Sequence, residues 1–200
     1  MKIPDGSHVR LRRSEMLDWI LKADGDILLF LQNYVRNALT DGFWKLITFL
    51  GDGGWFWIAT GILLLFFAKT RKAGVTALLA LLLGALVTNL LLKNLVARPR
   101  PYDMIAGLTP LVKKLKDYSF PSGHTCASFA AAVVYWKMLP KVWGRAGVIL
   151  AFLIAFSRLY VGVHYPTDVL AGGIIGGLMG ILAVYIIKYI RPEASTANIK

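Results

Sequence analysis

The strongest constraint on this fold is Gly74–Leu92, a long apolar stretch without a single charged side chain. A helix needs about 20 apolar residues to cross the hydrocarbon core of a bilayer, and this stretch approaches that length. Backbone N–H and C=O groups inside lipid need internal hydrogen-bond partners, which an α-helix supplies within one segment. The stretch therefore predicts a transmembrane helix, and we expect an integral membrane protein.

The composition supports this expectation. Of the 200 residues, 56% are hydrophobic and only 17% are charged, which is too apolar for an ordinary soluble domain. The net charge of +12 is typical of nucleic-acid-binding proteins, but those lack long uncharged runs, so we expect no nucleic-acid partner. The single cysteine, Cys126, excludes an internal disulfide and a cysteine-based metal cluster, and is interpreted as a packing residue.

The apolar segments predict an all-α, polytopic transmembrane helical bundle. We predict five membrane spans, namely Trp55–Ala68, Gly74–Leu92, His124–Leu139, Ala146–Val161 and Val169–Ile190. In the last of these, Gly172 and Gly176, and likewise Gly173 and Gly177, form small-xxx-small pairs that let helices approach closely. A sixth span near Asp26–Leu50 remains an alternative.

The remaining segments divide the chain into four parts. Residues 1–13 are predicted to form a basic tail that contacts anionic headgroups through His8, Arg10, Arg12 and Arg13. Residues 14–50 alternate apolar and charged side chains over runs too short to cross a bilayer, so they predict amphipathic interfacial helices. Residues 51–192 form the transmembrane core, and residues 193–200 form a C-terminal tail.

Charge predicts the orientation of the bundle. The basic connections 69–72 and 137–145 and the basic end 188–200 alternate so that they share one side, which the positive-inside rule makes cytoplasmic. The loop 96–122 and the turn 160–168 then lie on the outer face. Five spans also place the basic N-terminal tail outside, which that rule disfavours, so the N-terminal topology stays open.

A group of basic residues follows the second predicted span. Arg98 and Arg100 come within about two helical turns of Lys93, and prolines restrict the chain where it leaves the helix. A lysine at a span end usually extends its ammonium to the interface, which is the alternative for Lys93 alone. Lysine and arginine together suit a phosphate, because they combine a point charge with a planar fork.

A helix start is predicted at Pro121–His124, where a basic loop gives way to an apolar run. Ser122 can cap this helix and Gly123 leaves room for a ligand. Helix N-termini attract anions such as phosphate, and His124 would stand there as a proton donor or acceptor. The alternative is an ordinary helix start without a ligand.

A third group surrounds the start of the last predicted span. Arg158 interrupts an apolar run, where a charge is costly and needs a partner. Asp168 lies four residues after His164 and is the only acid between Tyr118 and Pro192, so it can accept the imidazole N–H. A structural ion pair between Arg158 and Asp168 is the alternative. A metal site is not expected, because cysteine ligands and carboxylate pairs are absent.

Three motifs together resemble the type-2 phosphatidic acid phosphatase superfamily. They are Lys93 with Arg100-Pro101, then Pro121–His124, then Ser157-Arg158 with His164 and Asp168. The family's helical bundle matches the predicted spans around these motifs. The N-terminal region departs from the family, because many members have a clear first span there.

The resemblance implies a two-step phosphoryl transfer without a cofactor. His164 would attack phosphorus to form a phosphohistidine, Asp168 would orient it, and His124 would protonate the leaving oxygen and then activate water. The phosphoryl oxygens would be held by Lys93, Arg100, Ser122, Gly123 and Arg158. Arg98 matches no motif position and is expected at the rim, and the basic loop 108–117 is expected to be solvated rather than a lid.

The resemblance also implies a lipid phosphate substrate that enters sideways from the bilayer. Undecaprenyl diphosphate, hydrolysed to undecaprenyl phosphate at the outer face of the plasma membrane, is the favoured substrate because the chain is short and has no extra domain. The alternative is a phosphatidic acid or phosphatidylglycerophosphate phosphatase. A vanadium haloperoxidase and a non-enzymatic lipid transporter or scaffold are the competing classes. The apolar spans disfavour the haloperoxidase, which is soluble, and a transporter has no need for two histidines with a carboxylate.

Overall fold

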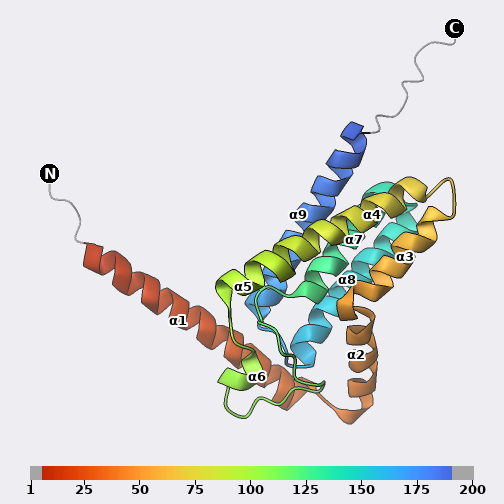
Figure 1. Cartoon of the computed structure of the whole chain (residues 1–200). Helices are drawn as coiled ribbons and strands as arrows, with labels where there is room; N and C mark the ends of the chain where they lie inside the picture. Colours follow the sequence, from red (N-terminus) through yellow and green to blue (C-terminus); the bar gives the residue numbers. More distant parts are fainter. Residues whose placement is uncertain (1–5, 191–200) are drawn as a thin grey trace, which may run out of the picture.

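The computed structural model describes residues 6–190, which fold into a helical bundle (Figure 1). Within these residues the regular secondary structure is entirely helical. The elements are α1 (Gly6–Phe30), η1 (Leu31–Val35), α2 (Ala38–Leu50), η2 (Asp52–Gly54), α3 (Trp55–Leu65), α4 (Arg71–Ala85), η3 (Leu86–Leu92), α5 (Lys93–Val96), α6 (Pro101–Met104), α7 (Gly123–Met138), α8 (Lys141–Tyr160) and α9 (Pro166–Ile190).

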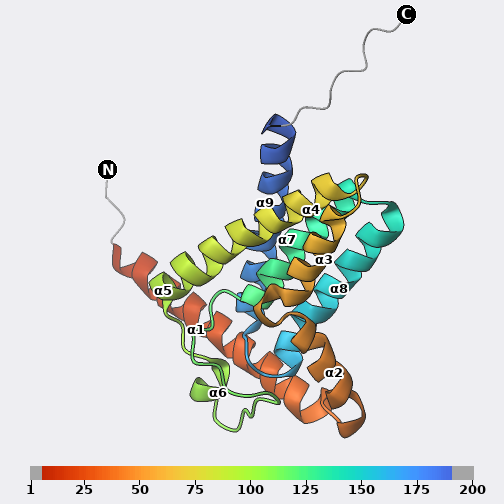
Figure 2. The same cartoon turned by 45° about the vertical axis from the view of Figure 1, so that its right-hand side comes forward.

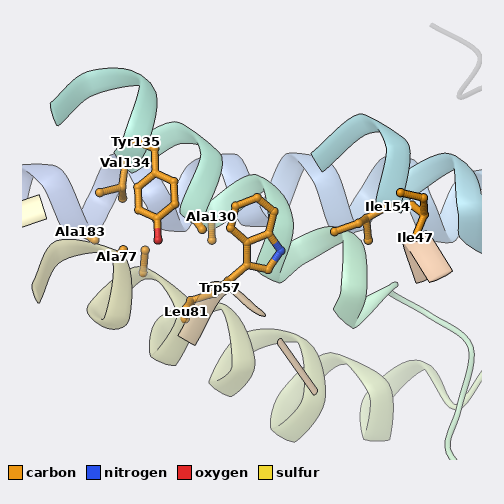
Figure 3. Packing of buried hydrophobic residues seen from close by; sticks show 11 residues of the cluster. Ile47, Trp57, Ala77, Leu81, Ala130, Val134, Tyr135, Ile154 and Ala183 are labelled. Carbon is orange, nitrogen blue, oxygen red and sulfur yellow. The ribbon is translucent and has the colours of Figure 1, made fainter. Parts of the chain in front are cut away.

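The centre of the bundle is α7, which packs against α4, α8 and α9 (Figure 2). Small side chains make this possible, because Ala130, Ala131 and Ala132 are all buried on α7. Figure 3 shows the core where α3 joins these helices, with Trp57 lying against Ala130 and near Tyr135. The indole Nε1 of Trp57 donates to the Ser128 hydroxyl at 2.9 Å, so this buried polar group is satisfied.

Glycines on α9 bring its backbone close to α7. A Cβ at Gly176 would lie 2.2 Å from the carbonyl oxygen of Cys126, and one at Gly172 would lie 2.5 Å from that of Ser122. The predicted close approach is therefore observed for the pair Gly172 and Gly176. The second pair does not act this way, because a Cβ at Gly177 would meet nothing within 4 Å.

All five predicted spans correspond to helices within residues 6–190, and the predicted all-α transmembrane bundle is confirmed. The count of five is not, because α7, with 16 residues, is not among the helices long and apolar enough to cross a membrane. By length and composition, three helical stretches in the described part of the chain can each cross a membrane, namely Arg71–Met104, Lys141–Tyr160 and Pro166–Ile190. Ala38–Leu50 and Asp52–Leu65 form a fourth if this pair, bent by 45°, is one span. The alternative of a separate sixth span near Asp26–Leu50 is therefore replaced by a bent span, in which α2 continues into α3.

The N-terminal region is more regular than its sequence predicted. Helix α1 begins at Gly6, inside the predicted tail, and lies obliquely across one end of the bundle (Figure 1). Exposed Trp19, Ile27 and Phe30 give it the apolar surface expected of an interfacial helix. The predicted headgroup contacts of His8, Arg10, Arg12 and Arg13, and the predicted tail 193–200, lie outside the described side chains and residues.

The two ends of the bundle differ in structure. The end beside α1 carries the loop 97–122 and the connection between α8 and α9, whereas the α3–α4 connection and the last turns of α9 lie at the other end (Figure 1). This separation matches the prediction that the loop 96–122 and the turn 160–168 share one side of the bundle. The loops that carry the predicted site residues thus lie at the same end.

Candidate active site

The predicted site residues gather at the loop-bearing end of the bundle, around a cavity of about 940 Å³. Segments far apart in the sequence line it: the η2 turn, the end of η3, the loop after α6, the start of α7 and the α8–α9 connection. Five predicted site residues lie on its wall, namely Lys93, Arg100, Gly123, His124 and His164. Ser122, Arg158 and Asp168 lie behind that wall and are almost fully buried.

The imidazole of His164 has a defined tautomer. Its Nε2 lies 3.0 Å from Nη1 of Arg100. A guanidinium only donates, so Nε2 accepts and its lone pair faces Arg100, which leaves the proton on Nδ1. Burial, followed by the positive charges of Arg100 and Arg158, lowers the pKa of His164 well below its usual value. His164 is therefore neutral at neutral pH.

Asp168 lies beside the other ring nitrogen of this imidazole, with Oδ2 3.4 Å from Nδ1 of His164. Its oxygens already accept hydrogen bonds, from the Ser119 hydroxyl and the Tyr165 N–H at Oδ2, and from Arg98 at Oδ1 over 2.7 Å. Asp168 itself is completely buried. The carboxylate is thus fixed close to His164 by partners other than His164.

Arg98 is not the rim residue that the sequence suggested. Its side chain is 15% exposed and joins Asp168 to Asp24 of α1, over 2.7 and 2.8 Å. The guanidinium also stacks on Tyr165, 3.7 Å from the ring centroid. The expectation failed because Asp24, the second carboxylate, comes from a segment predicted to lie at the membrane surface. Two buried carboxylates require a cation between them.

The predicted cap at the start of α7 is observed. The Ser122 hydroxyl accepts from the N–H of Thr125 at 3.4 Å and from its hydroxyl at 2.9 Å. Next to it, Nε2 of His124 lies 2.7 Å from Oδ1 of Asp52 in the η2 turn. A carboxylate accepts hydrogen bonds, so Nε2 of His124 carries a proton. Gly51 permits this arrangement, since a Cβ there would lie 2.6 Å from Cδ2 of His124.

Lys93 and Arg100 share one carboxylate, Asp117. The Lys93 ammonium donates to Oδ2 of Asp117, and Nη2 of Arg100 donates to Oδ1 at 2.6 Å. Burial alone would raise the pKa of Asp117, but the hydrogen bond from Lys93 and the charges of Arg100 and Lys93 together lower it to about 2. These two cations therefore converge on a single anionic group.

Arg158 lies deeper than the cavity wall. It is 2% exposed and donates from Nη1 to the Thr48 hydroxyl, and its Nε has no hydrogen-bond partner among the described residues. The alternative ion pair between Arg158 and Asp168 is not found, because Arg98 takes that position. An unpaired buried donor beside the cavity is consistent with a site that binds an anion.

Sequence reasoning missed Asp52, Asp117 and Ser119. Asp117 lies just outside the stretch between Tyr118 and Pro192 in which Asp168 is the only acid, and Asp52 belongs to none of the three predicted motifs. Each of the three stands next to a helix end or a motif at the loop-bearing end of the bundle, and this position was the available signal. Among the described residues, no three His, Cys, Asp or Glu side chains come close enough to hold a metal ion.

Comparison with known families gives a match over the same region. The model of the PAP2 superfamily matches residues 73–192, which include the three motifs and the helices that carry them.

Individual relatives agree with this match. The chain is 37% identical to an undecaprenyl-diphosphatase of Sulfolobus acidocaldarius, over 80% of this chain and 76% of that protein. It is 32% identical to a lipid A 4'-phosphatase of Bacteroides thetaiotaomicron, over 86% of this chain and 80% of that protein. A Bacillus subtilis transmembrane PAP2 type phosphatidylglycerolphosphate phosphatase superposes with a TM-score of 0.72 at 28% identity, covering 88% of this chain and 89% of that one.

Proposed function

The chain belongs to the PAP2 superfamily and is a membrane lipid phosphatase, and on this premise we propose that it hydrolyses undecaprenyl diphosphate to undecaprenyl phosphate and inorganic phosphate through a phosphohistidine on His164. The observation that carries the proposal is the pairing of Nε2 of His164 with Arg100 at the wall of a mixed polar and apolar cavity. The imidazole is neutral, and its Nε2 lone pair can attack phosphorus once a phosphoryl oxygen replaces it as the acceptor of the Arg100 N–H.

In the first step, Nε2 of His164 forms a bond to the terminal phosphorus and the bond from phosphorus to the lipid phosphate oxygen breaks. Negative charge grows on the leaving oxygen. His124 enters this step as the imidazolium, donates one proton to that oxygen and becomes neutral. Lys93 and Arg100 hold the phosphoryl oxygens and cancel their charge, which is the main requirement of phosphoryl transfer. Asp168 balances the positive charge that develops on the imidazole.

In the second step, His124 takes a proton from water while the water oxygen attacks phosphorus. The bond between phosphorus and Nε2 of His164 then breaks, which releases orthophosphate and restores the neutral imidazole. Ser122 is the cap of α7 and Gly123 its first residue, so the positive end of this helix would stabilise an anion bound in the cavity. Arg158 adds positive charge from behind the wall.

The cavity also has an apolar part that suits the hydrocarbon chain of a lipid substrate. Beyond the polar residues its lining is apolar and comes from α3 and α4, through Ile58, Leu78, Leu81, Leu82 and Ala85. An acyl or prenyl chain can lie along these side chains while its phosphate reaches the histidines. The lipid would then never leave the bilayer completely.

The identity of the lipid is inferred from the relatives. The undecaprenyl-diphosphatase is the more similar of the two curated relatives described above, and the match covers most of both chains. A phosphatidylglycerophosphate or phosphatidic acid phosphatase is the second candidate, favoured by the structural similarity to the Bacillus subtilis enzyme over 88% of this chain.

We further propose that the site faces the outside of the plasma membrane. The basic connections around Lys69–Lys72 and Lys137–Arg145 lie at the end of the bundle away from the cavity (Figure 1). Positive charge of this kind marks the cytoplasmic side.

Phosphate release by the purified protein tests the function. The panel compares C55 diphosphate, phosphatidic acid and phosphatidylglycerophosphate in one detergent with EDTA present. We expect C55 diphosphate to give the highest kcat/KM, and millimolar vanadate to inhibit because its five-coordinate form resembles the transition state. His164→Ala is expected to abolish release, while Lys141→Ala at the far end serves as the control.

Two results would contradict the proposal. A fully active His164→Ala enzyme would remove His164 from the nucleophilic role. A preference for phosphatidylglycerophosphate over C55 diphosphate would replace the proposed substrate with the second candidate, and absence of release from every lipid would refute the enzymatic function.

A further inference from the structure

The carboxylate of Asp117 occupies the donors that would hold a substrate phosphate. Its two oxygens accept from different cations, Lys93 and Arg100, as two oxygens of one phosphoryl group would. The backbone carbonyl of Asp117 accepts a further hydrogen bond from Nε of Arg100 at 3.1 Å. Three donor contacts are therefore directed at a single residue.

The exposure of the three side chains shows which of them faces outward. Arg100 and Lys93 are 3% and 11% exposed, whereas the Asp117 side chain is 50% exposed. The carboxylate thus covers two buried cations from the solvent side. A phosphoryl group that binds through both cations has to replace the two contacts of this carboxylate.

The loop around Asp117 is held at both sides. Before it, the Tyr102 hydroxyl accepts from the N–H of Leu115 at 2.9 Å and donates to its carbonyl at 3.0 Å. After it, the N–H of Ser119 donates to the carbonyl of Arg98 at 2.8 Å. Only a short stretch between these anchors has to move for Asp117 to leave the cations.

We propose that Asp117 is a specificity-determining residue, an internal carboxylate that competes with phosphate groups for Lys93 and Arg100. This inference rests on the proposed function, because it assumes that the two cations bind the phosphoryl group. The pKa of about 2 keeps Asp117 ionised at every pH at which the enzyme would be assayed, so the competition is constant. A ligand binds only when its own affinity exceeds that of the carboxylate.

The physical consequence is a threshold on affinity. A competitor that must be displaced raises the dissociation constant of every ligand by the same factor. Phosphodiester headgroups surround this site at high concentration but bind weakly through a single charge. Competition by Asp117 raises the dissociation constants of these headgroups above their concentration in the membrane. A terminal diphosphate carries more charge and still binds.

The test measures inhibition by two small anions. Inorganic phosphate represents a dianionic ligand and dimethyl phosphate a monoanionic one, and their inhibition constants are determined for wild type, Asp117→Asn and Asp117→Ser. Asp103→Asn is the matched control, because Asp103 also pairs with a lysine near this loop but at the surface, with Lys114 at 3.2 Å. Thermal shifts by the same anions report binding independently of turnover.

We expect both inhibition constants to fall by the same factor in the Asp117 variants, about tenfold, because two charge-assisted hydrogen bonds no longer have to be broken. The KM for lipid should fall while kcat stays similar, and Asp103→Asn should match wild type. Phosphatidylglycerol should also become an inhibitor of Asp117→Asn at mole fractions that leave wild type unaffected.

Three results would overturn the inference. Unchanged constants would show that Asp117 does not compete, and higher constants would show that it instead positions the two cations. A larger fall for inorganic phosphate than for dimethyl phosphate would mean that the carboxylate stays in place and repels charge. Each of these is distinct from failure of the proposed function, in which the wild-type enzyme would release no phosphate at all.

Discussion

Replacing Arg98 with methionine should destabilise this protein strongly. Arg98 is the cation between Asp168, which is completely buried, and Asp24, whose side chain is 3% exposed. Removing one partner of a buried ion pair costs about 3–5 kcal/mol. We do not double this range for two pairs, because Asp168 keeps the Ser119 hydroxyl and Asp24 keeps the N–H and hydroxyl of Thr167.

For a chain of this size, about 3–5 kcal/mol corresponds to a melting temperature lower by about 6–20 °C. Thermal unfolding in one detergent, followed by tryptophan fluorescence, measures the change. Arg145→Met on the exposed surface of α8 is the control and should melt like wild type. The double variant Arg98→Met with Asp24→Asn should recover part of the loss, since one unpaired carboxylate is gone. If Arg98→Met melts within about 2 °C of wild type, the ion-pair network does not stabilise the fold as argued.

Three further outcomes are expected. Gly176→Ala should lower the melting temperature by about 2–12 °C through overpacking against α7, whereas Gly177→Ala, with open space around it, should have no effect; equal behaviour of the two would contradict the packing argument. With an aryl phosphate, whose leaving group needs no proton, kcat/KM should stay constant as pH falls through 6.5, because the lowered pKa of His164 keeps its imidazole unprotonated. A decrease of kcat/KM centred at or above pH 6.5 would argue against this. Asp52→Asn should slow lipid turnover at least about tenfold but aryl phosphate turnover much less, because Asp52 orients the imidazole of His124 that protonates the leaving oxygen. Asp52→Glu should recover part of the loss, whereas the same loss on both substrates would indicate a merely structural role.

The pattern of apolar segments was sufficient to predict the bundle, because helix formation in a membrane depends on local composition. The helix start at Ser122 was equally predictable, since a cap is satisfied by a residue three positions away. The N-terminal region was harder. Helix α1 carries Leu28, which packs against Leu108 and Tyr165, and no local pattern indicates that such a contact exists.

In the candidate site, too, the residues of local motifs were predictable, whereas contacts between distant segments were not. The sequence placed Lys93, His124 and His164 on one face, and the structure brings all three to one cavity. It gave no sign that Asp52 meets His124 or that Asp117 meets Arg100, because each pair joins segments far apart in the chain.

What the sequence determined by itself is the class of fold, the positions of the helices and the set of charged residues at one membrane face. Hydrophobicity and motif spacing act over short stretches, so they are readable without a structure. The tertiary structure alone decided which carboxylate neutralises which cation. Arg98 serves Asp168 and Asp24, and Asp117 serves Lys93 and Arg100, because buried charges are paired by their distance in space rather than in sequence.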